Sequence, residues 1–205
     1  MRILRAPLEI IRANLRVYLL LSVAMYGICL VGFALALIFP DLRAGQVTTM
    51  VDNGTMALVM ELITQPWLFA ATILGVNVVT VGLKLILLPS LIVPFAGLAL
   101  FAHKSFIIGL TLAPADESGW AILIPHSLTW IIEFQAYVLL ILGVYLLGKY
   151  WIRPHTVGAP NHRRGYLAGL KALGRLSVPA MALFVIGAVY EAFSLRYLVV
   201  WIQSL

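Results

Sequence analysis

Charged side chains are scarce in this sequence, and acidic ones are the scarcest. Of 205 residues, 11% are charged, with 8 Asp and Glu against 14 Lys and Arg, whereas 62% are hydrophobic. Soluble domains carry roughly 25% charged residues, and disordered chains have few hydrophobic ones, so both classes are excluded. The composition is that of a polytopic membrane protein.

Cysteine occurs once, at Cys29, so the sequence excludes an intrachain disulfide and a cluster of thiolate metal ligands. The sequence also lacks a Gly-x-Ser-x-Gly elbow, a Walker loop ending in Lys-Ser or Lys-Thr, and the His-x-x-x-His or Glu-x-x-His spacings of metal sites. We therefore expect a protein that is not an enzyme and that holds no cofactor or metal.

Long apolar runs occupy most of the chain. Each run is continuous, whereas strands of a membrane barrel alternate polar and apolar residues over roughly ten positions, so the runs are helical. We expect an all-α, polytopic transmembrane helical bundle that forms a single membrane domain over residues 1–205. The runs are Val17 to Phe39, Trp67 to Ala113, Trp120 to Gly148 and Val178 to Ile202.

The net charge of +6 is concentrated at the flanks of these runs, which argues against a nucleic-acid partner. Residues 1–16 and 149–176 are basic, and the second segment, predicted to be a loop, contains no acid, so both are predicted to be cytoplasmic. This orientation predicts a multi-pass protein of the inner (cytoplasmic) membrane with a cytoplasmic N-terminus. The outward loops carry the acids Asp41, Asp52, Glu61, Asp116 and Glu117.

Three segments outside the spans are predicted to be helical. Residues 2–14 place apolar side chains among basic ones, as an amphipathic helix at the membrane interface does. Residues 53–66 predict a similar helix on the outer face, and Tyr166 to Leu176 a short cytoplasmic helix after an irregular segment rich in Pro and Gly.

The tract from Trp67 to Ala113 must cross the membrane an even number of times if both flanking segments are oriented as predicted. Two crossings give about five spans. The turn between them falls either at Lys84 or at His103-Lys104. We favour His103-Lys104, which leaves a short return leg, Ser105 to Ala113, of roughly 14 Å. So short a leg predicts a partly re-entrant hairpin.

A line of polar residues crosses the run from Trp120 to Gly148. His126 and Glu133 are seven residues apart, so they share a helix face about 10 Å apart along the axis. Thr129 and Tyr137 lie on the same stripe. The stripe is either a path for protons or a polar substrate, or a set of hydrogen bonds that fixes helix packing.

A second buried acid, Glu191, is predicted well inside the last span. We expect it to pair with another span, through His126 or through Lys84, which is spaced to share a face with Asn77. A pair of Lys84 with Glu133 is a further possibility, and neutral, protonated forms of both glutamates are the alternative to ion pairing. We expect His126, Glu133 and Glu191 to converge in the bundle interior, away from lipid.

Four short motifs follow one another in an order that resembles the stage II sporulation protein M family, over roughly residues 70 to 200. They are Gly75-Val76-Asn77 before the span Leu85 to Ala102, His103-Lys104-Ser105 through Gly109, Pro125-His126-Ser127, and Val189-Tyr190-Glu191-Ala192-Phe193. Two positions depart from that family. Ser127 replaces a glycine, and the glutamate expected about four residues after the histidine is displaced to Glu133, with Trp130 in its place.

The resemblance implies a non-enzymatic integral membrane subunit or scaffold of a bacterial envelope complex, surrounded by membrane lipid and bound to other membrane or envelope proteins. The layout is also similar to the membrane half of ABC-2 exporters, which place an interfacial helix before the first span. The alternative is therefore a permease subunit served by a separate cytoplasmic ATPase. A homo-oligomer is compatible with either reading.

Overall fold

The computed structural model describes residues 2–198, apart from the side chains of residues 2–4, 117, 118, 121 and 198. These residues form helices joined by short connections, and none of them belongs to a strand. The predicted all-α bundle is confirmed. Residues 199–202, the end of the last predicted span, lie outside the described residues.

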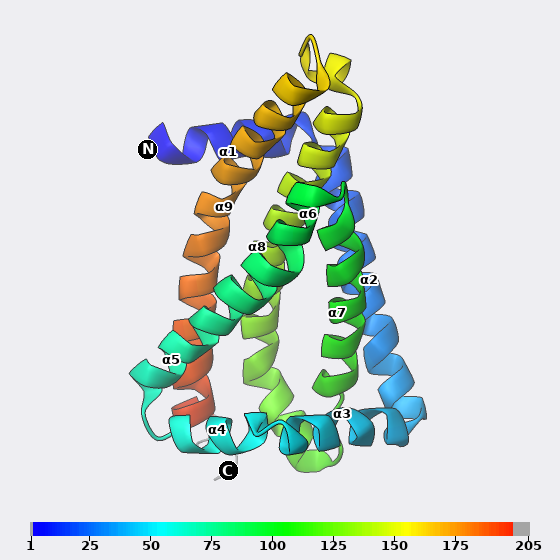
Figure 1. Ribbon diagram of the computed structural model, residues 1–205. Coiled ribbons are helices and arrows are strands. Elements are labelled where there is room, and N and C mark those ends of the chain that lie inside the picture. The colour runs from blue at the N-terminus through cyan, green and yellow to red at the C-terminus, as the bar shows by residue number, and fades with distance from the viewer. Residues whose placement is uncertain (1, 199–205) are drawn as a thin grey trace.

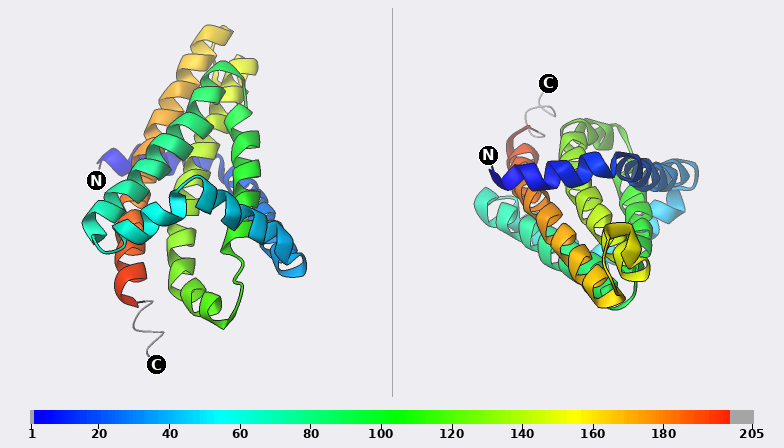
Figure 2. Two further views of the ribbon diagram at one scale, coloured as in Figure 1. Left: turned by 60° about the horizontal axis from the view of Figure 1, so that its bottom comes forward. Right: turned by 90° about the horizontal axis from the view of Figure 1, so that it is seen from above.

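Short helices lie across both ends of the bundle (Figure 1). At one end, α1 (Arg2–Ala13) crosses the bundle and packs on the last long helix, as the view from above in Figure 2 also shows. At the other end lie α3 (Pro40–Asp52) and α4 (Thr55–Leu62). Helices are thus present near residues 2–14 and 53–66, where they were predicted, and α3 is an additional one. Of the three, α1 is the strongly amphipathic helix.

Four helical stretches among the described residues are long and apolar enough to cross a membrane: Leu15–Ile38, Pro66–Ile92, Ile122–Ile152 and His162–Tyr197. The first is α2, and the second joins α5 (Pro66–Gly75), the π-helix η1 (Val76–Leu87) and α6 (Leu88–Ile92). A fifth apolar helix, α7 (Ala96–Leu112), has 17 residues, or about 26 Å. It runs along α2, as Figure 1 shows.

The predicted turn at His103-Lys104 is wrong, and so is the alternative at Lys84. The chain turns at Val93–Phe95, between α6 and α7, so the return leg is the whole of α7 and not the re-entrant piece Ser105 to Ala113. The turn has a local cause, because Pro94 holds Val93 in an extended conformation (φ −121°, ψ 118°). Phe95 then takes a left-handed conformation (φ 67°).

Ser90 closes this turn from inside. Its hydroxyl accepts a hydrogen bond from the Gly97 amide (2.8 Å) and donates one to the Ile86 carbonyl (2.7 Å). Ser90 is buried, so both backbone groups would lose their partners without it. Tyr166 adds a bond from its hydroxyl to the Leu91 carbonyl (3.1 Å), which ties the turn to the last helix.

The centre of the bundle is α8 (Glu117–Ile152), which packs along α9 (His162–Phe193) as an antiparallel hairpin. Segment 149–176 is therefore not a loop. Instead α8 continues to Ile152, and α9 is unbroken from His162, with only the short 3-10 helix η2 (Pro154–Val157) between them. The close packing has a sequence cause, because a Cβ at Gly165 or Gly169 would overlap the backbone of α8.

Basic and acidic residues lie at opposite ends of the bundle. The basic residues of segments 1–16 and 149–176 lie at the end crossed by α1, and the acids of α3 and α4 lie at the opposite end (Figure 1). Arg43 at the acidic end is used internally, since its Nε donates to the Ala113 carbonyl (2.7 Å) where α7 ends.

This arrangement predicts opposite accessibility for two engineered cysteines in a Cys29→Ala background. Gly45→Cys on α3 and His155→Cys at the tip of the hairpin are both at exposed positions. In intact bacterial cells, we expect a membrane-impermeant maleimide to label Gly45→Cys, and to label His155→Cys only after the cells are opened. Labelling of His155→Cys alone in intact cells would invert the orientation.

Candidate functional site

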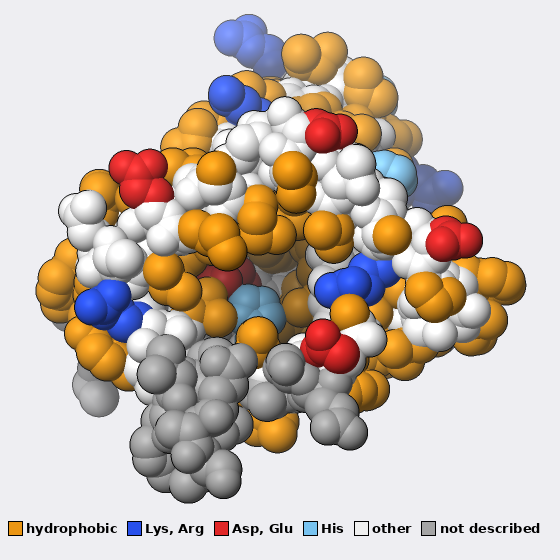
Figure 3. Space-filling view, turned by 90° about the horizontal axis from the view of Figure 1, so that it is seen from below, with side chains coloured by type: hydrophobic (Ala, Val, Ile, Leu, Met, Phe, Trp, Pro, Cys, Tyr) orange, Lys and Arg blue, Asp and Glu red, His pale blue; other side chains and the backbone are white. Residues whose placement is uncertain are grey.

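A cavity of about 320 Å³ opens among α4, α5, η1, α7, α8 and α9. Figure 3 looks into it from the end that carries α3 and α4: hydrophobic side chains surround a hollow in which acidic and histidine side chains are visible. The rim is apolar, with Leu58, Leu62, Phe69 and Leu112 among its residues. The interior is polar, and six of the seven residues predicted as an intramembrane cluster line it: Asn77, His126, Thr129, Glu133, Tyr137 and Glu191.

Three of these residues form a hydrogen-bonded chain at the inner end of the cavity. The Tyr137 hydroxyl donates to Asn77 Oδ1 (2.9 Å), and Asn77 Nδ2 donates to Glu133 Oε1 (2.5 Å). Tyr137 and Asn77 are 4% and 8% exposed. The chain therefore fixes the Asn77 amide and aims one Glu133 oxygen, while leaving the second carboxylate oxygen without a hydrogen bond from a described side chain.

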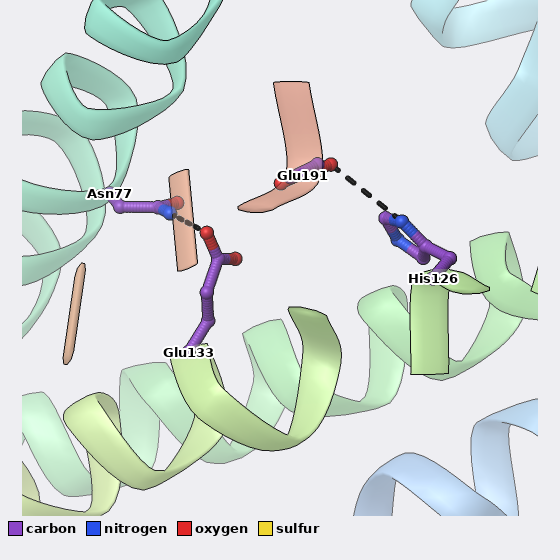
Figure 4. Close-up of polar contacts among 4 residues, drawn as sticks. All are labelled: Asn77, His126, Glu133 and Glu191. Carbon is purple, nitrogen blue, oxygen red and sulfur yellow. Dashed lines mark hydrogen bonds and ion pairs between the residues drawn. The ribbon is translucent and has the colours of Figure 1, made fainter. Parts of the chain in front are cut away.

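A second contact joins α8 to α9. His126 Nδ1 lies 3.8 Å from Glu191 Oε1, which makes this the only ion pair between described residues. At that distance the two groups are too far apart for a hydrogen bond, and they attract as an ion pair when His126 is protonated and Glu191 is ionised. In Figure 4, the side chains of Asn77, Glu133, Glu191 and His126 all point into the space between the helices.

Lys84 is not part of the cluster. It is exposed on the outside of η1, as is Thr80, whereas Asn77 is buried. The expected shared face assumed α-helical spacing, but residues 76–87 form a π-helix, whose wider i→i+5 turns change which positions align. A pair of Lys84 with Glu133 or Glu191 is thus excluded by position.

Lys104 supplies the cation that Lys84 does not. It lies on α7, is partly buried and lines the cavity opposite α9. Sequence reasoning missed it because His103-Lys104 was interpreted as a turn. No described carboxylate lies within 4.0 Å of its ammonium group, so Lys104 and the two glutamates face one cavity without pairing.

Thr129 has an unusual hydrogen-bonding state for a helical threonine. Thr48, Thr49 and Thr72 each donate to the carbonyl four residues earlier. Thr129 is 1% exposed and lines the cavity, and its buried hydroxyl has no partner among the described residues. An unpartnered buried hydroxyl is destabilising, so the site is incomplete without a further polar group.

Gly187 makes room for the Glu133 side chain. A Cβ at Gly187 would lie 2.7 Å from Glu133 Cγ, so α9 can pass over this glutamate only because residue 187 has no side chain. The π-helix on the other side brings Asn77 inward to meet it. Such π segments are rare and are frequent at functional sites.

A separate polar group ties α2 to α8. Tyr18 donates to Gln135 Oε1 (2.7 Å), Gln135 Nε2 donates to the Tyr26 hydroxyl (3.2 Å), and Tyr26 donates to the Ile131 carbonyl (3.1 Å). Each of its three side chains is hydrogen-bonded, so this group accounts for helix packing. The cavity differs in that respect.

The cavity can therefore bind a small polar molecule within a membrane bundle. It places an anionic side, a cationic side and an unpartnered hydroxyl around one space. No group of three or more His, Cys, Asp or Glu side chains within the described part of the chain is arranged to hold a metal ion. Comparison of the chain with protein families, curated proteins and solved structures gives no match.

Proposed function

We propose that the chain is a non-enzymatic integral membrane subunit of a bacterial envelope complex, with its N-terminus in the cytoplasm. The observation that supports this best is the end of the α8–α9 hairpin. This basic tip, as we call it, is residues 149–176. Its charged residues are all cationic and include Arg153, Arg163, Arg164, Lys171 and Arg175, all exposed.

The basic tip extends beyond the membrane. With 36 residues, α8 is about 54 Å long, whereas the hydrocarbon core is about 30 Å thick. The remainder projects as a rigid helical hairpin. A span needs only a few flanking cations to fix its orientation, so the length of the projection has another use.

The position of the charges supports a docking role. Arg163 and Arg164 occupy the first turn of α9, which contains no acid. Cations are unfavourable there, by roughly 0.3 to 1 kcal/mol each, because the helix dipole is positive at its N-terminus. This local loss of helix stability is offset when an acidic partner binds the two arginines. The basic tip therefore fits an acidic protein surface in the cytoplasm.

A permease subunit served by a separate ATPase is the second candidate. The observation that favours it is the polar cavity, which opens at the end opposite the basic tip (Figures 1 and 3). A permease requires both a site for its substrate and a cytoplasmic surface for its ATPase. The two candidates share a prediction, because each needs a partner at the basic tip.

Affinity purification from native membranes tests the proposal. We expect tagged wild-type protein to retain a stoichiometric partner, and the double variant Arg163→Gln/Arg164→Gln to lose most of it. The partner should also dissociate at high salt, because salt screens exposed charges over about 10 Å at 0.1 M. The matched control is Arg12→Gln/Arg16→Gln, which removes the same charge from exposed positions at the same end.

The identity of the partner separates the two candidates. An ATPase in stoichiometric amount favours the permease, and an envelope protein favours the scaffold. A lone monomer in mild detergent contradicts both. Equal loss in the Arg12→Gln/Arg16→Gln control would show that net charge, and not the basic tip, retains the partner.

A further inference from the structure

We propose that the cavity binds a small zwitterion of the amino-acid type, with its ammonium group between Glu133 and Glu191 and its carboxylate at Lys104. This inference is independent of the docking function proposed above. It rests on three features of the cavity: separated opposite charges, an unpartnered buried hydroxyl, and a suitable volume.

The first feature is charge separation across one space. Glu133 on α8 and Glu191 on α9 line the cavity on one side, and Lys104 on α7 lines it on the other. Side chains this flexible would pair directly if nothing else occupied the space, since an unpaired charge inside a membrane protein is costly. They do not pair within 4.0 Å. A ligand with a cation at one end and an anion at the other neutralises both sides at once.

The second feature is the set of free hydrogen-bonding positions. Within the described part of the chain, the Thr129 hydroxyl has no partner, and His126 Nδ1 has only the long 3.8 Å contact with Glu191. Asn77, in contrast, is held on both sides, because its oxygen accepts from Tyr137 and its amide nitrogen donates to Glu133. Thr129 and His126 thus leave positions at which the charged groups of a polar ligand can form hydrogen bonds.

The third feature is volume and wall chemistry. A cavity of about 320 Å³ is at the lower end of the range, about 300 to 1,000 Å³, that binds small molecules. Apolar side chains form most of the remaining wall, including Phe69, Ile73, Val76 and Ile108. A zwitterion with an apolar side chain therefore satisfies both the polar interior and the apolar rim, which makes leucine a suitable probe.

The test is equilibrium binding of radiolabelled L-leucine to purified full-length protein in nanodiscs, with two unlabelled competitors. Leucinamide keeps the ammonium and lacks the carboxylate, and N-acetyl-leucine has the reverse. We expect saturable leucine binding and competition at least about tenfold weaker by each analogue, because each lacks one charge-assisted contact. Equal competition by leucinamide, or no saturable binding, overturns the proposal.

Variants assign the contacts. We expect Glu191→Gln and Lys104→Met each to weaken leucine binding about tenfold or more, and Thr129→Val by a smaller factor. The controls are Glu9→Gln and Lys84→Met, which remove the same charges from exposed positions outside the cavity and outside the basic tip. Unchanged affinity in both cavity variants contradicts the assignment.

Two further readouts keep the result interpretable. A single symmetric peak on gel filtration and an unchanged melting temperature show that a variant is folded, so that lost binding reflects the site. Partner recovery is measured on the same variants. Loss of leucine binding with partner recovery intact separates the ligand site from the docking function, and the basic-tip variant should show the reverse.

Discussion

Replacing Gly109 by alanine will destabilise the protein by about 2 to 3 kcal/mol, the usual range for an overpacked contact. The Cβ of the new side chain would overlap the Cys29 carbonyl on α2, and the Phe33 amide lies only 2.8 Å from the same point. Both obstacles are backbone atoms of a membrane-spanning helix. Neither can move aside as a flexible side chain would, so the two helices must separate.

A glycine of α2 makes the matching close contact with α7. A Cβ at Gly32 on α2 would overlap the Phe106 carbonyl on α7. Close approach at two small residues supplies the dispersion contacts that hold membrane helices together where no hydrophobic force does so. At 17 residues, α7 is short for a span, so packing on α2 is its main support.

Thermal unfolding in detergent, followed by circular dichroism, measures the effect. The matched control is Gly27→Ala on α2, where a Cβ would meet no atom within 4 Å. We expect the control to be neutral or up to about 1 kcal/mol more stable, because alanine favours helix over glycine. Equal stability of Gly109→Ala and Gly27→Ala would mean that α2 and α7 are not in backbone contact.

The sequence predicted the spans better than the turn between two of them. Apolar length alone identifies a membrane helix, because about 20 apolar residues are needed to cross the core. The turn at Val93–Phe95 depends instead on Pro94 and on the two hydrogen bonds of Ser90. His103 and Lys104 are polar, which suggested a turn, but both lie within α7, where Lys104 lines the cavity and His103 is exposed.

Glycines illustrate a second limit. Gly27, Gly32, Gly143 and Gly148 all suggest close helix contacts in the sequence, yet Gly27 faces open space. Gly32 and Gly143 meet neighbouring helices, and Gly148 meets the Phe95 ring in the turn before α7. A small residue shows where close approach is allowed. Only the relative rotation of two helices decides whether approach occurs, and that rotation is not encoded locally.

The site was predicted in part for a related reason. The stripe from His126 to Tyr137 follows from α-helical spacing within one helix, and α8 is regular there. Lys84 was misplaced because residues 76–87 wind as a π-helix. The sequence carries no obvious signal for that winding, so the cation of the cavity, Lys104, emerged only from the assembled bundle.

Changing Glu133 to methionine will destabilise the protein by about 1 to 2 kcal/mol, whereas glutamine will be tolerated within about 0.5 kcal/mol. Glutamine keeps an oxygen that can accept from Asn77 Nδ2, and it keeps the unbranched shape that passes under Gly187. Methionine keeps only the shape. The difference between the two variants therefore reports the hydrogen bond to Asn77.

Leucine at position 133 should be worse than methionine. Its branch lies at Cγ, the atom closest to the point where a Gly187 side chain would begin, so the two methyl groups would press against α9. Overpacking of this kind adds about 1 kcal/mol or more to the lost hydrogen bond. The expected order of stability is wild type, glutamine, methionine and leucine.

Unfolding measurements on the three variants distinguish a structural glutamate from one that is needed only for ligand binding. A double-mutant cycle of Glu133→Met with Asn77→Val isolates the pair, and we expect a coupling of about 1 kcal/mol. If methionine proves as stable as glutamine, the bond to Asn77 does not support the fold. If glutamine itself unfolds the protein, the carboxylate charge is structural, and the binding experiments must then rest on Glu191 and Lys104.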